Sequence, residues 1–82
     1  MTHTTIKQLR AKYNELEANN DHNEAAKLLV DQFGTEDERD IIEGITVRHK
    51  RRGYISNEDR TLRHNVSQKY FRLMINLSIL DS

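Results

Sequence analysis

The sequence predicts a small all-α domain of about four helices. Proline is absent and glycine occurs only three times in 82 residues, so nothing forces strands, long loops or linkers. Apolar residues recur at spacings of three and four, and residue types that begin or end helices stand between the apolar stretches. We therefore expect a single helical domain over residues 1–82, with helices at 6–18, 21–33, 36–52 and 57–79.

The first helix is expected at 6–18. Thr5 precedes the first apolar residue, and Gln8 follows three residues later, which is the spacing of a capping box. Apolar side chains then form one stripe along the helix: Ile6, Leu9, Tyr13 and Leu16. The "NND" of residues 19–21 ends this helix and begins the next.

The second helix is expected at 21–33. Asp21 is the predicted N-cap, with Glu24 three residues later as its partner. Gly34 follows directly, at a position where a left-handed residue commonly ends a helix. The predicted buried face consists of Ala25, Ala26, Leu29, Val30 and Phe33.

The third helix is expected at 36–52, behind a second capping box formed by Thr35 and Glu38. Its apolar stripe is Ile41, Ile42 and Ile45. Gly44 lies inside this helix, at a cost of about 1 kcal/mol relative to alanine. The "GITV" that starts there fits a short strand as an alternative.

The fourth helix is expected at 57–79, after a stop at Gly53 and a capped restart at Ser56 and Asp59. Its 23 residues give a length of about 35 Å. One apolar seam follows it and is the predicted core face: Leu62, Val66, Tyr70, Leu73, Leu77 and Leu80.

From Tyr70 onward this helix carries a second apolar set beside the seam. A helix that is apolar on nearly all sides must be covered on nearly all sides. Self-association, or a groove for a protein partner, is one explanation, and burial within the same chain or insertion into a membrane surface are the alternatives. The predicted self-association or partner face is Tyr70, Phe71, Met74, Ile75 and Ile79.

Composition narrows the class of protein. Cysteine is absent, so disulfides and thiolate metal sites are excluded. No run approaches the roughly 18 apolar residues of a membrane span, and the N-terminus lacks the apolar core of a secretory signal. We therefore expect a cytoplasmic, soluble protein without a membrane partner. The net charge is zero, but residues 1–20 carry +1, residues 21–43 carry −6 and residues 44–82 carry +5.

A run of five basic or imidazole side chains, residues 48–52, ends the third helix. Helix stabilisation explains it without any ligand, because basic groups at the C-terminal end interact favourably with the helix dipole. The functional alternative is a basic patch, formed if the turn at Gly53 brings the start of the fourth helix beside the end of the third. The predicted patch is Arg48, Arg51, Arg52, Tyr54, Arg60, Arg63 and His64.

Catalysis is not indicated by the sequence. The four histidines have no metal-ligand spacing, and Asp21, His22 and Glu24 are better explained as the start of a helix. No Gly-rich phosphate loop or nucleophile motif is present. We expect no catalytic residue, no bound metal and no cofactor.

The sequence thus favours a non-catalytic binding protein that acts on another protein and forms a homodimer through its last helix. We expect a protein of the kind found among the inhibitors and accessory factors of phages and mobile elements, which include small cysteine-free helical proteins. The rival prediction is a nucleic-acid-binding protein that uses the basic patch.

Overall fold

The computed structural model describes residues 5–80, and these form four α-helices and no strand. The helices are α1 (Ile6–Ala18), α2 (His22–Phe33), α3 (Glu36–Arg52) and α4 (Asn57–Leu80). The predicted all-α class is confirmed, and each predicted boundary lies within one residue of the observed one. The strand alternative for "GITV" is wrong, because α3 continues through it without interruption.

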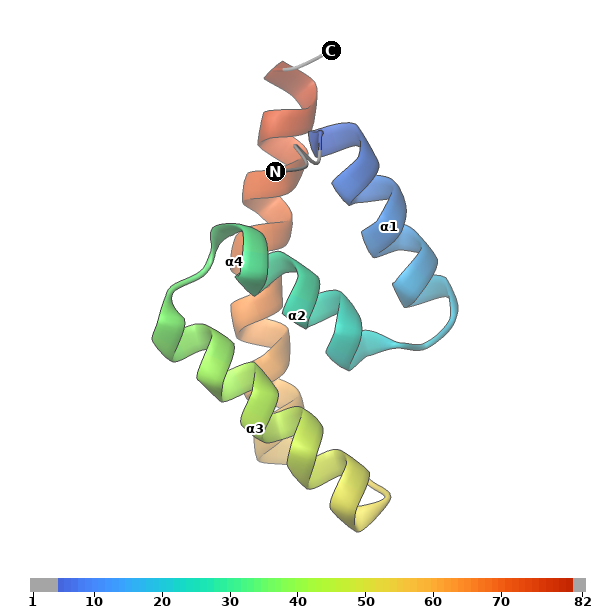
Figure 1. Ribbon diagram of the computed structural model, residues 1–82, viewed down its shortest axis with the longest axis vertical. Helices are drawn as coiled ribbons and strands as arrows, with labels where there is room; N and C mark the ends of the chain where they lie inside the picture. The colour runs from blue at the N-terminus through green and yellow to red at the C-terminus, as the bar shows by residue number, and fades with distance from the viewer. Residues whose placement is uncertain (1–4, 81–82) are drawn as a thin grey trace.

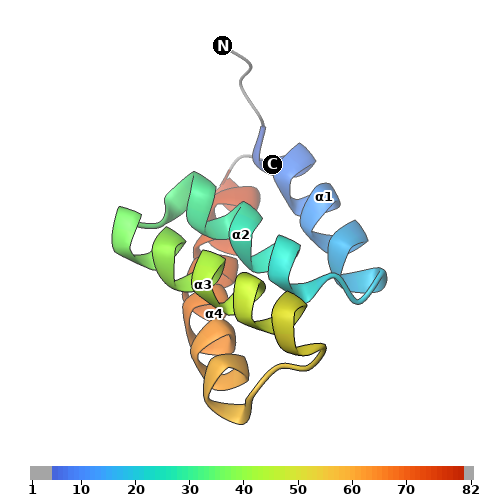
Figure 2. The same cartoon turned by 60° about the horizontal axis from the view of Figure 1, so that its bottom comes forward.

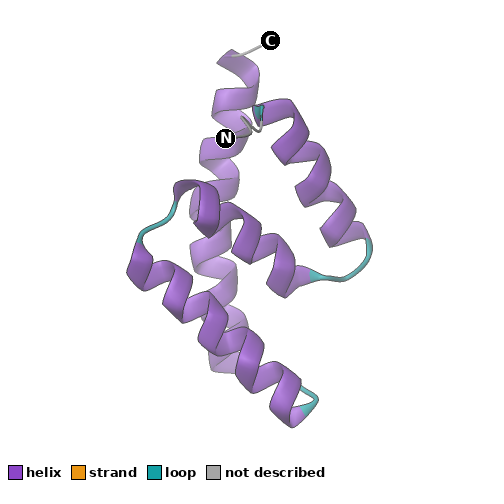
Figure 3. Ribbon diagram, in the orientation of Figure 1, coloured by secondary structure: helices purple, strands orange, loops and turns teal. Residues whose placement is uncertain are grey.

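The helices α1, α2 and α3 form a zigzag layer in Figure 1, and α4 runs behind that layer along the long axis of the molecule. Figure 3 shows that only short loops interrupt the helices. Both α2 and α4 pack against all three other helices. Within the described chain no helix combines the length and apolar character needed to cross a membrane.

Both Thr capping boxes are confirmed. Thr5 Oγ1 accepts a hydrogen bond from the Gln8 amide at 3.1 Å, and Gln8 Oε1 accepts one from the Thr5 amide at 3.2 Å. At the start of α3, Thr35 Oγ1 accepts from the Glu38 amide at 3.2 Å and Glu38 Oε1 accepts from the Thr35 amide at 2.9 Å. Two helix starts are therefore encoded locally in four residues each.

The turn between α1 and α2 differs from the prediction. Asp21 occupies the N-cap position, but its side chain makes no capping hydrogen bond. Its backbone, at φ −92° and ψ 60°, lies outside the extended region that capping side chains require. The turn is instead closed by Asn20 at φ 60°, with the Asp21 amide bonded to the Leu16 carbonyl at 2.8 Å. This is a left-handed helix end in which asparagine takes the place usually held by glycine.

Gly34 also differs from the prediction, because it is extended at φ −83° and ψ 172° and not left-handed. Its lack of a side chain has a steric reason, since a Cβ there would lie 2.9 Å from the backbone of Val30. Gly53 does adopt the predicted left-handed conformation at φ 78°, and its amide bonds the His49 carbonyl at 2.8 Å.

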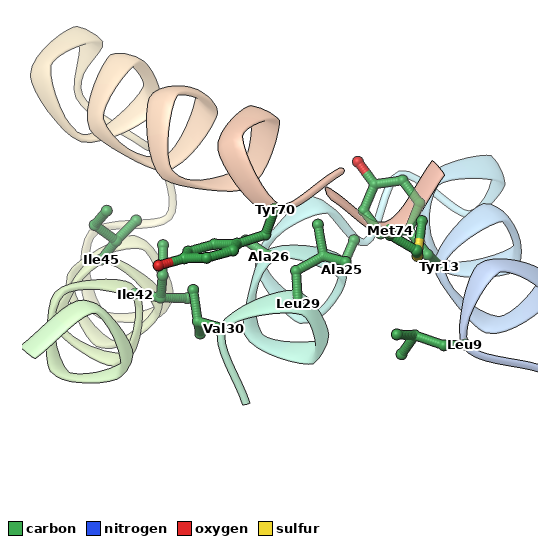
Figure 4. Close-up of a cluster of buried hydrophobic side chains, with 10 residues drawn as sticks. All are labelled: Leu9, Tyr13, Ala25, Ala26, Leu29, Val30, Ile42, Ile45, Tyr70 and Met74. Carbon is green, nitrogen blue, oxygen red and sulfur yellow. The ribbon is translucent and has the colours of Figure 1, made fainter. Parts of the chain in front are cut away.

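The core lies where α2 meets the other three helices (Figure 4). Its buried side chains come from all four helices: Leu9, Tyr13, Ala25, Ala26, Leu29, Val30, Ile42, Ile45, Tyr70 and Met74. The small Ala25 and Ala26 of α2 leave room for the large Tyr70 and Met74 of α4.

This packing corrects the predicted seam of α4. The inward line runs through Ser67, Tyr70 and Met74, whereas Leu73 of the predicted seam is 40% exposed. The other helices cover α4 from one side only, as the views in Figures 1 and 2 show. Part of its apolar surface therefore faces solvent.

Candidate functional site

Three members of the predicted basic patch, Arg60, Arg63 and His64, line one cleft, whereas Arg48 is paired within the chain. Arg48 donates two hydrogen bonds to Asp59 across the turn, from Nε to Oδ2 and from Nη2 to Oδ1, both at 2.9 Å. These bonds lower the pKa of the Asp59 carboxyl and raise that of the Arg48 guanidinium. Gly44 helps this contact, because a Cβ there would lie 3.1 Å from Arg48 Nη1. Arg48 thus serves to hold α3 to the start of α4.

Three further patch residues are exposed at the end of α3 and in the following turn: Arg51, Arg52 and Tyr54. Tyr54 is 60% exposed and lies beyond Gly53, outside the core. The positive charge of Arg52 contributes to the lowered pKa of Asp59, so this arginine also lies near the acidic start of α4.

Arg63 belongs to a different, half-buried group. Its Nη1 donates to Asn23 Oδ1 at 2.7 Å, and Asn23 Nδ2 lies 2.9 Å from His49 Nδ1. Burial lowers the pKa of the Arg63 guanidinium, while the nearby Glu17 carboxylate opposes this shift. The group joins α4, α2 and α3, and Arg63 also lies near Arg60, whose charge contributes to the lowered pKa of Arg63.

Arg60 and His64 line a cleft of about 540 Å³ between α4 and the end of α1. On its far wall Glu17 accepts a hydrogen bond from the Tyr13 phenol at 2.8 Å and pairs with His22. Burial, and next the bond to Glu17, raise the pKa of Tyr13 to about 12, so the phenol remains a donor at neutral pH.

Sequence reasoning missed the groups on this wall. The available signal was the "NND" turn, because a turn of three residues brings Glu17 close to His22. Over the part of the chain described, no three histidine or acidic side chains gather as a metal-binding group.

A second group of polar side chains, which sequence reasoning also missed, connects α3 to α4. Glu38 accepts hydrogen bonds from the Tyr70 phenol and from Lys69 Nζ, the latter at 2.7 Å. Together with the Thr35 amide, these donors lower the pKa of Glu38 to about 2. Lys69 Nζ also lies 4.8 Å from the centre of the Tyr70 ring. The carboxylate that caps α3 is therefore also its anchor to α4.

The predicted self-association face is divided by the fold. Tyr70 is 8% exposed and Met74 is fully buried, so these two side chains lie in the core of the chain. Phe71 packs against the core with its ring centre 5.3 Å from that of Tyr13, and Ile75 is half-buried. Only Ile79, at 64% exposure, lies largely in solvent. Tyr13 of α1 contacts Phe71, while Phe33 of α2 and Glu38 of α3 contact Tyr70.

Two other surfaces of α4 remain open to solvent. The first, called the leucine stripe below, consists of Leu62, Leu73 and Leu80. The second, called the polar ridge, follows a spacing of four residues and consists of Arg60, His64, Gln68 and Arg72. The three leucines were predicted as members of the buried seam, and the polar ridge was not predicted as a unit.

In comparisons with protein-family models, with curated proteins and with solved structures, the chain matches none.

Proposed function

We propose that this chain is a non-catalytic binding protein of the cytoplasm that acts through protein–protein contact, and that a second copy of the chain is a partner. The observation that carries the proposal is the leucine stripe. Leu62, Leu73 and Leu80 lie on one side of α4 and are 39%, 40% and 81% exposed. Apolar side chains gathered in a line on a surface favour contact with a partner, unlike single scattered ones.

The stripe is part of a longer register along α4. Residues on this side of the helix alternate at spacings of four and three: Leu62, Val66, Lys69, Leu73, Asn76 and Leu80. This is the spacing with which two helices pack along each other. The register contains two polar residues, Lys69 and Asn76. Polar residues at such positions lower the stability of a helix pair but specify how its two helices are aligned.

The register is self-complementary in the antiparallel direction. With a two-fold axis near residue 71, Leu62 meets Leu80 of the second copy and Lys69 meets Leu73. A parallel pair would place the two Lys69 side chains opposite each other, and their like charges would repel. In the antiparallel pair the Lys69 methylenes cover a leucine while the ammonium stays with Glu38. The antiparallel pair is therefore the arrangement we propose.

The biological role that fits such a protein is that of an inhibitor or accessory factor, of the kind phages and mobile elements encode. The uneven distribution of charge supports binding. Residues 21–43 carry a net charge of −6, and residues 44–82, which follow them in the sequence, carry a net charge of +5. Charge segregation of this kind steers association with a charged protein surface.

The rival function, nucleic-acid binding through the patch around residues 48–64, has less support. Asp59 pairs with Arg48, and Asn23 holds Arg63 inward, so two of its arginines are engaged within the chain.

Light scattering after gel filtration tests the proposal. We expect the mass of a dimer for the wild-type chain at tens to hundreds of micromolar, and the mass of a monomer for Leu73→Asp, because a carboxylate in the middle of the stripe would have to be buried without a partner. Circular dichroism should show that the variant keeps its helices.

Val47→Asp is the matched control. Val47 is an exposed apolar residue of α3, at 53% exposure, and lies outside the stripe. Val47→Asp likewise replaces an exposed aliphatic side chain with aspartate, and it should leave the dimer intact. A wild-type chain that remains monomeric at the highest concentration, or equal losses in both variants, would contradict the proposed self-association.

A further inference from the structure

The polar ridge of α4 is a candidate binding surface distinct from the leucine stripe. Its side chains, Arg60, His64, Gln68 and Arg72, follow one row of the helix. Arg60, His64 and Arg72 are exposed and Gln68 is half-buried. Within residues 5–80 these four make no hydrogen bond or ion pair with another side chain. Their polar groups are therefore available to a ligand.

The electrostatic surroundings of the ridge are one-sided. From Arg60 to Leu80 the sequence contains no aspartate or glutamate, although the chain has 13 acidic residues in all. Two carboxylates from other helices, Glu17 and Glu38, lie near α4 and are hydrogen-bonded within the chain, Glu17 by Tyr13 and His22 and Glu38 by Lys69 and Tyr70. Residues 60–80 carry a charge of +4, from Arg60, Arg63, Lys69 and Arg72, so a polyanion at the ridge meets mainly positive charge on α4.

A shallow groove of about 440 Å³ accompanies the C-terminal half of the ridge. It is lined by His64, Asn65, Gln68, Lys69 and Arg72. All five are cationic, imidazole or amide side chains. Arginine and lysine bind phosphates and guanine edges, and the amides of asparagine and glutamine pair with adenine edges. The lining therefore offers groups for both the phosphates and the bases of a nucleic acid, whereas a purely ionic surface would offer groups for the phosphates alone.

We propose that α4 binds double-stranded DNA by laying the polar ridge along the major groove. Twelve residues separate Arg60 from Arg72, which is about 18 Å along the helix axis. The groove is about 12 Å wide and admits one α-helix. The other helices cover α4 from one side only (Figure 2), and the end of α1 lies across a cleft from Arg60, His64 and Gln68, so α1 flanks α4 at the edge of the groove. Arg60 and Arg72 then contact the phosphates at either end, and His64 and Gln68 face the bases between them.

The binding mode does not require self-association, because the leucine stripe lies on a different side of the helix. It also differs from the predicted patch, since it uses Gln68 and Arg72 and leaves Arg48 with Asp59.

Fluorescence anisotropy with a labelled 20-base-pair duplex of mixed sequence tests the proposal. We expect a dissociation constant on the order of micromolar at 20 mM salt, which weakens steeply as salt rises because phosphate-bound counterions are released. Gln68→Glu places one carboxylate in the middle of the ridge and should weaken binding about tenfold. Arg72→Ala should lower the slope of log K against log salt by about 0.9, the value for one lost phosphate contact.

Gln32→Glu and Arg39→Ala are the matched controls, on exposed positions of α2 and α3. They make the same chemical changes away from the ridge and should leave the affinity within about twofold. Circular dichroism should show that all four variants retain their helices. The proposal is overturned if the duplex does not bind at 20 mM salt, or if controls and ridge variants weaken binding equally. Tighter binding to a single strand, to duplex RNA or to anionic vesicles would also overturn it.

Discussion

Tyr70 of α4 donates its phenol hydrogen bond to Glu38, the residue whose carboxylate closes the capping box at the start of α3. One side chain thus fixes both the beginning of a helix and its place against another. The ring of Tyr70 also stacks on Phe33, with ring centres 6.4 Å apart. This corner therefore couples the α2–α3 connection to α4.

Removing the phenol oxygen should weaken this corner. We expect Tyr70→Phe to lower the free energy of unfolding by about 1.5 to 3 kcal/mol, the range for a hydrogen bond to a charged partner. Urea unfolding followed by circular dichroism measures the change. Tyr54→Phe makes the same substitution at an exposed position in the turn and should cost less than about 0.5 kcal/mol. Equal effects of the two variants would argue against the Tyr70–Glu38 bond.

Stability should fall with acid because of the same carboxylate. The folded chain holds the pKa of Glu38 at about 2, below its usual value of 4.5. A lowered pKa stabilises the folded state at pH values above 4.5, and that contribution is lost as the pH falls from there towards 2. We therefore expect the unfolding free energy to decrease across this window.

A neutral variant isolates this contribution. Glu38→Gln keeps a residue that also completes a capping box, but it cannot titrate. Its stability should depend less on pH between 4.5 and 2 than that of the wild type. The matched control Glu43→Gln changes an exposed carboxylate of the same helix and should keep the wild-type slope. A wild-type slope in Glu38→Gln would show that other carboxylates cause the acid sensitivity.

The buried side of α4 can be tested at Met74. This side chain is fully buried, so Met74→Ala should destabilise the fold by about 2 to 5 kcal/mol, through lost burial and the cavity left behind. Val47→Ala removes apolar atoms from an exposed site and should cost less than about 1 kcal/mol. A small effect at Met74 would mean that the helix faces the core with a different side.

The helices could be predicted because their signals are local. Thr5 with Gln8, and Thr35 with Glu38, lie three residues apart, and Gly53 marks a left-handed stop. These signals depend on neighbouring backbone groups and need no knowledge of the fold. They account for the agreement in helix boundaries.

The orientation of α4 could not be predicted in the same way. Leu73 and Met74 are both apolar, and apolar residues surround the C-terminal half of this helix, so periodicity alone does not identify the side that is buried. The small residues of α2 decide it, because Ala25 and Ala26 admit Tyr70 and Met74. That information lies about 45 residues away in the sequence.

The internal partners of the basic-patch residues could not be predicted for a related reason. Arg48 and Asp59 are eleven residues apart, on opposite sides of a turn, and they meet only when α4 folds back beside α3. Asn23 similarly reaches Arg63 from a distant helix. Sequence runs reveal which charges are present, but tertiary partners determine which remain available to a ligand.

The two glycines that lack left-handed geometry should respond in opposite directions to alanine. At Gly34 a Cβ would lie 2.9 Å from the Val30 backbone, which cannot move without bending the end of α2. We expect Gly34→Ala to destabilise the fold by about 1 to 3 kcal/mol. At Gly44 the nearest atom, at 3.1 Å, is the terminal nitrogen of Arg48, which can shift. Gly44→Ala should therefore gain up to about 1 kcal/mol of helix propensity.

Thermal and urea unfolding of both variants measure these changes. A further comparison separates helix propensity from the Arg48–Asp59 contact at Gly44. In the background Asp59→Asn, Arg48 has lost its ionic partner, so Gly44→Ala should stabilise this background at least as much as it stabilises the wild type. Equal destabilisation by Gly34→Ala and Gly44→Ala would contradict the difference between a rigid backbone neighbour and a flexible side chain.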